Sequence, residues 1–287
     1  MAGPKHSCGV VAMSATYDIV PSLYKALSVI QHRGQESAGI SVFNGEITET
    51  VKGNGLVSVA LSDDKLKDIS GNCGIGHVRY STTGSKAAVN AQPLTVESTF
   101  GTIAIAHNGD ITNFAKLKDE YMKKGWSFLT DSDSEMVARI LSKYLTQTED
   151  FIDAIRATMK ELDGAYSLTI MIKDRIFGVR DPYGFRPLCI GKFDEAYMMV
   201  SESAALDTLR GEFVRDVEPG EIVEIKADSF ISYPMMEKCP KAHCMFEWIY
   251  FARPDSIMDG REVENPRDGV AWWAAVYEVT QSRTRLK

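Results

Sequence analysis

The sequence has few cysteines, and they do not form the pattern of a disulfide framework. Its 287 residues include 5 cysteines, an odd number, scattered at positions 8, 73, 189, 239 and 244. Small secreted proteins that depend on disulfides carry dense, even-numbered sets of cysteines. The pattern therefore excludes that class and favours a cytoplasmic protein.

Long hydrophobic runs and runs of one charge sign are also missing. No segment approaches the ~18 consecutive apolar residues that a membrane-spanning helix needs. The first residues, Met1 to Ser7, lack the apolar core of a secretory signal. The 32 basic residues are outnumbered by 39 acidic ones, for a net charge of -7, and no Lys/Arg run stands out. We therefore expect neither a membrane nor a nucleic acid as partner, and a small polar substrate fits better.

The sequence shows no internal repeat, and its 44% hydrophobic content is enough for a substantial core. Helical periodicity and strand-like runs both occur, without a regular alternation of strand and helix. This pattern favours an α+β fold in which helices pack on two antiparallel sheets. Asn44-Gly45 is typical of a hairpin turn between two strands. The helical blocks are 21–30, 114–121, 136–144 and 151–162, and the strand-like runs are 8–13, 40–43, 74–80, 102–107, 167–172, 175–180, 188–192, 197–201 and 221–225.

Cys8 is the first candidate for chemistry. Only residues 1–7 precede it, and Gly9 and an apolar pair follow it. If those first residues were removed, Cys8 would carry a thiol and a free α-amine. Such an amine titrates near ~8 and can accept a proton close to neutral pH. The alternative is an ordinary buried cysteine of the first strand.

Four other polar segments supply what thiol attack on an amide requires. Arg33 lies in the cluster 31–39, and Arg79 lies where a strand enters the small-residue loop 81–85, so that it can grip a carboxylate. The Asn108 amide and the Gly109 N–H are a competent pair of oxyanion donors. Asp133, in segment 130–135, can bind a substrate ammonium.

Each of these segments also has a purely structural interpretation. The cluster around Arg33 can be a solvated loop, and Arg79 can be an ordinary ion-paired arginine at a strand end. Asn108-Gly109 can be a turn dipeptide. Ser132 and Glu135 have the spacing of a helix capping box.

Taken together, the segments resemble the class-II glutamine amidotransferases and, more narrowly, the glutamine phosphoribosylpyrophosphate amidotransferase (amidophosphoribosyltransferase) family of purine biosynthesis. The resemblance covers roughly residues 8–259. The residues that carry it are 8–11, 32–37, 76–82, 107–109, 132–135, 180–187, 201–209, 218–221 and 251–256.

The resemblance implies an N-terminal-nucleophile hydrolase fold, a four-layer αββα sandwich of two antiparallel sheets. It implies an enzyme that releases ammonia from glutamine through a cysteine thioester. The loop 79–85 resembles a flap that closes over glutamine. The implied catalytic residues are Cys8, Asn108 and Gly109, and the implied substrate-binding residues are Arg33, Arg79 and Asp133, with Arg33 ordering the surroundings of the nucleophile.

The expected organisation is a leader at 1–7 that is removed, an amidotransferase domain at 8–258, and a divergent tail at 259–287. The phosphoribosyltransferase domain of longer relatives is expected to be absent. Members of this family can use Mg²⁺ or a 4Fe-4S cluster. Cys244 matches one cluster ligand, but the others have no counterpart, so no cofactor or metal is expected in this chain.

Three interpretations remain open. The chain can be a glutaminase module that feeds a separate phosphoribosyltransferase subunit, and a homo-oligomer is expected. It can be a truncated, catalytically idle copy that serves as a binding or scaffold subunit. It can also be a papain-like cysteine peptidase that pairs Cys8 with His32, His77 or His107.

Overall fold

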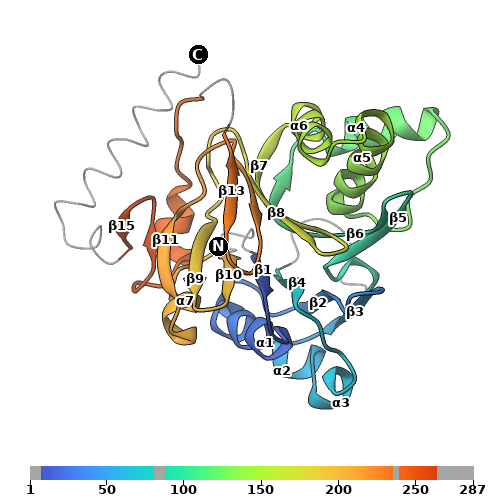
Figure 1. Cartoon of the computed structure of the whole chain (residues 1–287). Helices are drawn as coiled ribbons and strands as arrows, with labels where there is room; N and C mark the ends of the chain where they lie inside the picture. Colours follow the sequence, from blue (N-terminus) through green and yellow to red (C-terminus); the bar gives the residue numbers. More distant parts are fainter. Residues whose placement is uncertain (1–7, 81–87, 235–238, 264–287) are drawn as a thin grey trace.

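Two antiparallel sheets stacked face to face dominate the computed structural model, which describes residues 8–80, 88–234 and 239–263 (Figure 1). The seven-stranded sheet has the order β11-β9-β10-β1-β4-β2-β3, and the six-stranded sheet has the order β13-β12-β8-β7-β6-β5. The strands of the first are β1 (Gly9–Ala15), β2 (Ser37–Phe43), β3 (Thr48–Asn54), β4 (Cys73–Arg79), β9 (Cys189–Phe193), β10 (Ala196–Val200) and β11 (Glu212–Asp216). Those of the second are β5 (Leu94–Ser98), β6 (Gly101–Ile111), β7 (Gly164–Ile172), β8 (Arg175–Arg180), β12 (Ile222–Ile225) and β13 (Phe230–Tyr233).

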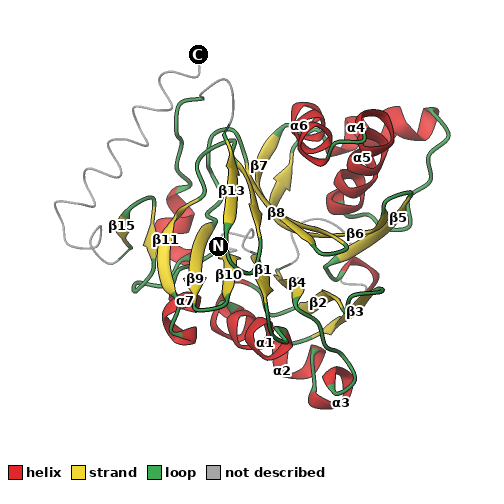
Figure 2. Cartoon of the chain, viewed as in Figure 1, coloured by secondary structure: helices red, strands yellow, loops and turns green. Residues whose placement is uncertain are grey.

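Helices cover the outer face of each sheet, which gives four layers (Figure 2). One apolar core joins the seven-stranded sheet to α1, α2 and α7, and another joins the six-stranded sheet to α4, α5 and α6. A third core fills the space between the sheets. The helices are α1 (Val20–Val29), α2 (Val57–Ala60), α3 (Asp63–Leu66), α4 (Phe114–Lys123), α5 (Asp133–Thr148), α6 (Phe151–Glu161) and α7 (Ala204–Leu209), with short turns η1 (Gln31–Arg33), η2 (Ala88–Asn90) and η3 (Glu247–Phe251).

The alternation of side chains along the strands decides what faces the space between the sheets. Val10 and Ala12 of β1 belong to the same buried cluster as Ala104 and Ala106 of β6. Because successive side chains of a strand point to opposite faces, positions 8 and 108 continue these two faces toward one end of the sandwich. That end therefore holds polar groups next to an apolar interior.

The expected α+β sandwich of two antiparallel sheets is confirmed. The hairpin at Asn44-Gly45 is also confirmed, because Gly45 has a φ of 103° between the paired strands β2 and β3. The strand-like runs left out four strands of the two main sheets, β3, β5, β11 and β13, although the hairpin turn at Asn44-Gly45 implied β3. These lie at the edges of the sheets, where half-exposed polar residues hide the alternation.

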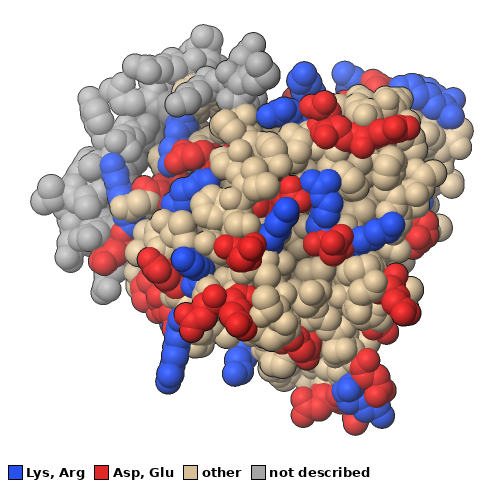
Figure 3. Space-filling view, in the orientation of Figure 1, with Lys and Arg blue, Asp and Glu red and all other residues tan. Residues whose placement is uncertain are grey.

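The surface shows mixed charge. On the face seen in Figure 3, Lys and Arg side chains lie among Asp and Glu side chains, and neither sign forms a continuous patch. This face therefore offers no extended basic surface of the kind that follows a phosphate backbone. Within the described ranges, no helix is both long and apolar enough to cross a bilayer.

The described chain continues through a small hairpin, β14 (Ile257–Met258) and β15 (Arg261–Glu262), with Asp259 at its turn. The Asp259 carboxylate pairs with Arg180, Lys241 and His243 at 3.1, 2.6 and 3.2 Å. The ion pair with Arg180 of β8 therefore holds Asp259 against the sandwich. The expected domain boundary between 258 and 259 stays a prediction, and the expected leader and most of the expected tail lie outside the described residues.

Candidate active site

Cys8 lies at the polar end of the sandwich, directly before the central strand β1. It is 8% exposed. Its backbone nitrogen lies 3.3 Å from Oδ1 of Asn108, and its Sγ lies 3.6 Å from the carbonyl oxygen of Tyr80. Its own carbonyl oxygen accepts a hydrogen bond of 2.8 Å from Nε of Arg33. The residue is therefore held from both sheets and from η1.

Asn108 joins the nucleophile to the second sheet. It is 1% exposed near the end of β6. Its Oδ1 faces the Cys8 nitrogen, whereas its Nδ2 is buried without a hydrogen-bond partner among the described residues. A buried amide donor without a partner is costly, so its presence beside a thiol indicates a group that a ligand oxygen satisfies.

Gly109 occupies a position that only glycine tolerates. Its φ is 148°, and a Cβ built there would lie 2.0 Å from the carbonyl oxygen of Ala165 on β7. A side chain would therefore force β6 and β7 apart at this point. The interpretation of Asn108-Gly109 as a simple turn dipeptide is wrong, because both residues pair with β7 inside the sheet.

Arg33 is fully committed to protein groups. It is 1% exposed, and Nε binds the Cys8 carbonyl while Nη1 lies 2.5 Å from Glu202. Its Nη2 binds both carboxylate oxygens of Glu247 at 2.9 and 2.7 Å. The expectation that Arg33 binds substrate fits these contacts less well than its other expected role, which is to order the backbone of the nucleophile. The solvated-loop interpretation is wrong for this residue.

Sequence reasoning missed the acidic partners of Arg33. Glu202, between β10 and α7, also accepts from His32 at 2.9 Å and from the Arg253 nitrogen at 3.0 Å. Burial raises the pKa of Glu202, but the Arg33 charge and the His32 bond outweigh it and bring that pKa to about 2. Glu202 lies in one of the segments that carry the family resemblance, but nothing in its local pattern revealed an inward-facing carboxylate.

Opposing influences act on the pKa of the Cys8 thiol. Burial raises its pKa, and the Tyr80 carbonyl and the charges of Arg79, Arg186 and Arg33 lower it, with a net rise. Removing the thiol proton therefore requires a base nearby. This need is consistent with a proton acceptor on the same residue.

Arg79 ends β4, which is the strand next to β1. The register pairs Gly9 with Val78, so the next step brings Cys8 beside Arg79. Its side chain is 6% exposed and continues the face of β4 that points between the sheets. The loop that follows, which the resemblance identifies as a flap, falls on residues 81–87 and lies outside the described residues.

Asp133 begins α5 and reaches back to β6. Its Oδ2 accepts from the Ile111 nitrogen at 3.2 Å, and its Oδ1 lies 3.4 Å from Nδ1 of His107. Burial raises its pKa, but His107 and backbone N–H groups outweigh this, and the net pKa is below its ordinary value. Asp133 is thus an anion at neutral pH. It contacts His107, which directly precedes Asn108 on β6.

Ser132 and Glu135 do not form the expected capping box. Ser132 does cap α5, since its Oγ accepts from the Ser134 nitrogen at 3.3 Å. Glu135 does not return to the Ser132 nitrogen. Its carboxylate accepts from the backbone nitrogens of Leu129 and Thr130 and so ties down the preceding loop. This loop geometry leaves Asp133 facing β6.

Within the described residues, none of the three histidines that a peptidase could use is hydrogen-bonded to the Cys8 sulfur. His32 binds Glu202, and Nε2 of His77 binds the carbonyl oxygen of His107 at 2.9 Å. Burial lowers the pKa of His77 to about 3, so this ring is neutral. Among the residues with described positions, no imidazole forms the Cys–His pair that a papain-like mechanism requires.

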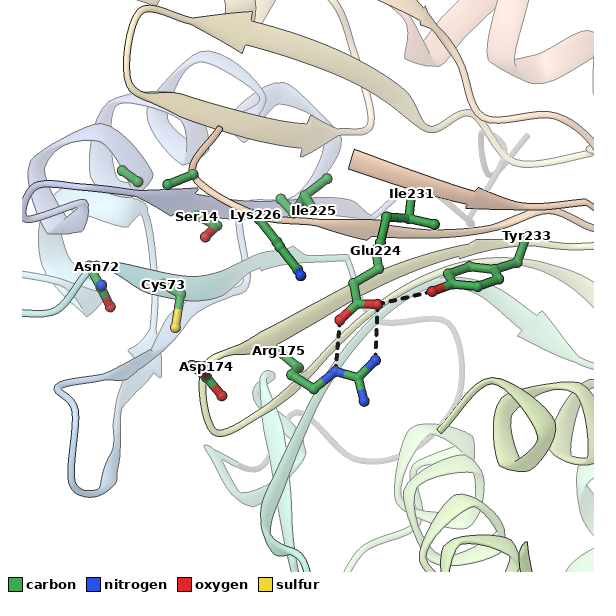
Figure 4. Close-up of a pocket in the computed structure, with 12 residues that line it drawn as sticks. Ser14, Asn72, Cys73, Asp174, Arg175, Glu224, Ile225, Lys226, Ile231 and Tyr233 are labelled. Atoms are coloured by element: carbon green, nitrogen blue, oxygen red, sulfur yellow. Dashed lines mark hydrogen bonds and ion pairs between the residues drawn. The ribbon is translucent and has the colours of Figure 1, made fainter. Parts of the chain in front are cut away.

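A separate hollow lies at the opposite end of β1 and β4, where Ser14 and Cys73 line it (Figure 4). Arg175 and Glu224 form a bidentate ion pair there at 2.7 and 2.9 Å. Burial and the charge of Asp174 raise the pKa of Cys73 to about 12. Cys73 is therefore a poor nucleophile, and it lacks the arginine charges that partly offset the effect of burial at Cys8.

In the part of the chain that the structure describes, no group of three or more His, Cys, Asp or Glu side chains could hold a metal ion. Cys239 and Cys244 are both free thiols.

The comparisons with known proteins define the class first. Residues 77–208 match a family described as the glutamine amidotransferase domain. The solved structure titled "Structure of the allosteric regulatory enzyme of purine biosynthesis" superposes with a TM-score of 0.84 at 36% identity, over 91% of this chain and 56% of that chain. This chain therefore contains a glutamine amidotransferase domain with the αββα sandwich of N-terminal-nucleophile hydrolases.

The comparisons then narrow the family. The amidophosphoribosyltransferase of Methanocaldococcus jannaschii is 46% identical over 91% of this chain and 59% of its own length. The glutamine phosphoribosylpyrophosphate amidotransferase of B. subtilis, solved with ADP and GMP, gives a TM-score of 0.83 at 35% identity, covering 91% of this chain and 56% of that one. The chain is homologous to the amidophosphoribosyltransferases and spans a little over half their length.

Proposed function

We propose that this chain hydrolyses glutamine to glutamate and ammonia through a thioester on Cys8. Two features of Asn108 carry the proposal. Its Oδ1 faces the backbone nitrogen of Cys8, and its buried Nδ2 has no hydrogen-bond partner among the described residues. The first feature places the nucleophile beside the amide, and the second supplies a donor for the oxyanion.

The proposed reaction begins when the α-amine of Cys8 takes the thiol proton. The thiolate then attacks the side-chain amide carbon of glutamine, and the carbonyl oxygen becomes an oxyanion that accepts hydrogen bonds from Asn108 Nδ2 and the Gly109 N–H. The C–N bond breaks, and ammonia leaves with the proton held by the amine. Water then adds to the thioester, the C–S bond breaks, and glutamate and the thiol are restored.

Arg79 and Asp133 are proposed to hold the two charged ends of glutamine. The guanidinium grips the α-carboxylate and the carboxylate holds the α-ammonium. A substrate held at both charged ends places its side-chain amide at a fixed distance from the Cys8 sulfur. Asparagine, which is one methylene shorter, is therefore expected to react far more slowly.

The base in this scheme exists only if the bond between Ser7 and Cys8 is cleaved, so maturation belongs to the proposal. Mass spectrometry of the purified protein tests it. A chain that begins at Cys8 supports the scheme, and a chain in which all molecules retain residues 1–7 contradicts it.

The central experiment compares the wild type with Cys8→Ser in an assay that measures glutamate and ammonia. The variant is expected to fold with an unchanged melting temperature and to lose turnover. Undiminished ammonia release from Cys8→Ser would refute the assignment. If the wild type itself lacks activity, the second candidate applies, namely an idle copy that serves as a binding subunit.

The wider context is also proposed. The ammonia would pass to a phosphoribosyltransferase in a separate subunit, in the cytoplasm, and the chain would self-associate. Co-purification with such a subunit, and light scattering of the purified chain, test these two points.

A further inference from the structure

Glu247 places a buried carboxylate between two arginines of the site. It begins the π-helical turn η3, and it is 1% exposed although its neighbour on the same turn, Tyr250, is 64% exposed. Nη2 of Arg33 donates to both of its oxygens at 2.9 and 2.7 Å, and Nη1 of Arg186 donates to Oε1 at 2.9 Å. One carboxylate thus binds two guanidinium groups.

Arg33 contacts Cys8 directly, whereas Arg186 acts on it through its charge. Arg33 donates to its carbonyl oxygen at 2.8 Å, and the charges of Arg33 and Arg186 favour the thiolate over the thiol. Two guanidinium groups that bind the same carboxylate repel each other in a buried environment, where charges are weakly screened. The shared anion offsets that repulsion and lets Arg186 bind the same carboxylate that holds Arg33, whose Nε donates to the Cys8 carbonyl oxygen.

Glu202 does not duplicate this role. It binds Arg33, but its other contacts are His32, the Arg253 nitrogen and the Ser256 hydroxyl. Among the described acidic side chains with printed contacts, Glu247 alone contacts both Arg33 and Arg186. Its removal therefore acts on two cations at once.

We propose that Glu247 is a positioning residue for the proposed glutaminase reaction: its carboxylate ties Arg33, which binds the Cys8 carbonyl oxygen, to Arg186 and so fixes the backbone and the electrostatic environment of the nucleophile. The inference rests on the proposed function. Its test nevertheless uses thiol reactivity, which needs no glutamine.

The experiment measures the rate of Cys8 alkylation by iodoacetamide from pH 5 to 10, read from the Cys8 peptide by mass spectrometry so that other cysteines do not interfere. In Glu247→Gln the two arginines lose their shared anion and separate from the sulfur, so the profile is expected to shift to higher pH by about one unit, a tenfold loss of thiolate below the pKa. The same variant should lower kcat for glutamine more than tenfold while KM changes less than threefold.

A purely local charge effect gives the opposite sign. If the arginines stayed in place, removing a negative charge would favour the thiolate and shift the profile to lower pH. A downward shift overturns the proposal, and so does an unchanged profile. Because Glu247→Gln leaves buried cations underneutralised and can prevent folding, Glu247→Asp provides a second test. It keeps the charge but shortens its reach, and it should shift the profile upward by a smaller amount.

Glu224→Gln is the matched control. Glu224 is also a buried glutamate in a bidentate ion pair with an arginine (Figure 4). It lines the hollow with Ser14 and Cys73, at the end of β1 and β4 opposite Cys8. The control is expected to lose stability and keep the Cys8 profile. If the wild type alkylates normally but never hydrolyses glutamine, the proposed function fails while the role of Glu247 is still decided by the profile.

Discussion

The backbone nitrogen of Cys8 lies 3.3 Å from the side-chain oxygen of Asn108, although the two residues are 100 positions apart in the chain. The contact bridges the two sheets at their polar end. It fixes the orientation of the Asn108 amide, because an oxygen that faces the Cys8 N–H directs Nδ2 elsewhere in the site. The nucleophile and the oxyanion donor are therefore set by one interaction.

Asn108→Asp tests this relationship. The aspartate keeps the shape and the acceptor but replaces the Nδ2 donor with an oxygen. We expect kcat for glutamine to fall roughly 10²–10³-fold, as when other oxyanion donors are removed, with KM little changed. Asn113→Asp is the control, because the hydrogen bonds of the Asn113 side chain within the described part of the chain go to the backbone of residues 161 and 163. Equal kcat values for Asn108→Asp and wild type would contradict the role.

Gly109→Ala should destabilise the fold as well as the site. The new Cβ would lie 2.0 Å from the Ala165 carbonyl oxygen at a φ of 148°. Gly45→Ala is the matched control, with a φ of 103° and nothing within 4 Å of the new Cβ. It should cost only about 1 kcal/mol of unfolding free energy. We expect a clearly larger loss for Gly109→Ala in chemical denaturation, and equal losses would show that the strands yield easily.

Substrate anchoring should appear in KM. Asp133→Asn removes the charge proposed to hold the glutamine ammonium and should raise KM at least tenfold, since a charge-assisted hydrogen bond contributes about 1.5–3 kcal/mol. Asp131→Asn serves as control, because its side chain is 74% exposed in the same loop. Steady-state kinetics of both variants decide the matter, and the role is rejected if they share one KM.

Arg79→Met should likewise raise KM for glutamine, because the proposed partner of the α-carboxylate is lost. Its effect on a glutamine analogue whose α-carboxylate is replaced by an amide should be small, since that analogue offers no anion to bind. A KM increase of the same size for both substrates would place Arg79 outside the carboxylate site.

Glu202 should make stability depend on pH in the acid range. Its pKa is about 2 in the folded protein against an ordinary value of 4.5. A folded pKa below the unfolded one gives stability that is present above about pH 5 and lost as pH falls from about 4.5 to 2. The shift corresponds to about 3 kcal/mol. Unfolding free energies of Glu202→Gln should lack this part of the acid loss, whereas the exposed Glu46→Gln should retain it.

The architecture could be predicted where the pattern was strong. The apolar runs of β1, β4, β6 and β7 predicted these strands, which are buried on both faces over most of their length. The helical periodicity of α1, α5 and α6 predicted these helices, because each buries one face. Strand β3 was missed because it lies at an edge and is half exposed. The short helices α2 and α3 have four residues each, too few for periodicity to register.

Local sequence determined which chemical groups are available: a cysteine before an apolar strand, an Asn-Gly pair, and separate arginine and aspartate residues. Tertiary structure alone decided which of these groups meet. The Cys8–Asn108 contact depends on how two sheets stack, and the burial of Glu202 and Glu247 against Arg33 depends on where distant loops return to the sandwich. Neither can be read locally, because a carboxylate in a loop has the same sequence pattern whether it faces water or a buried guanidinium.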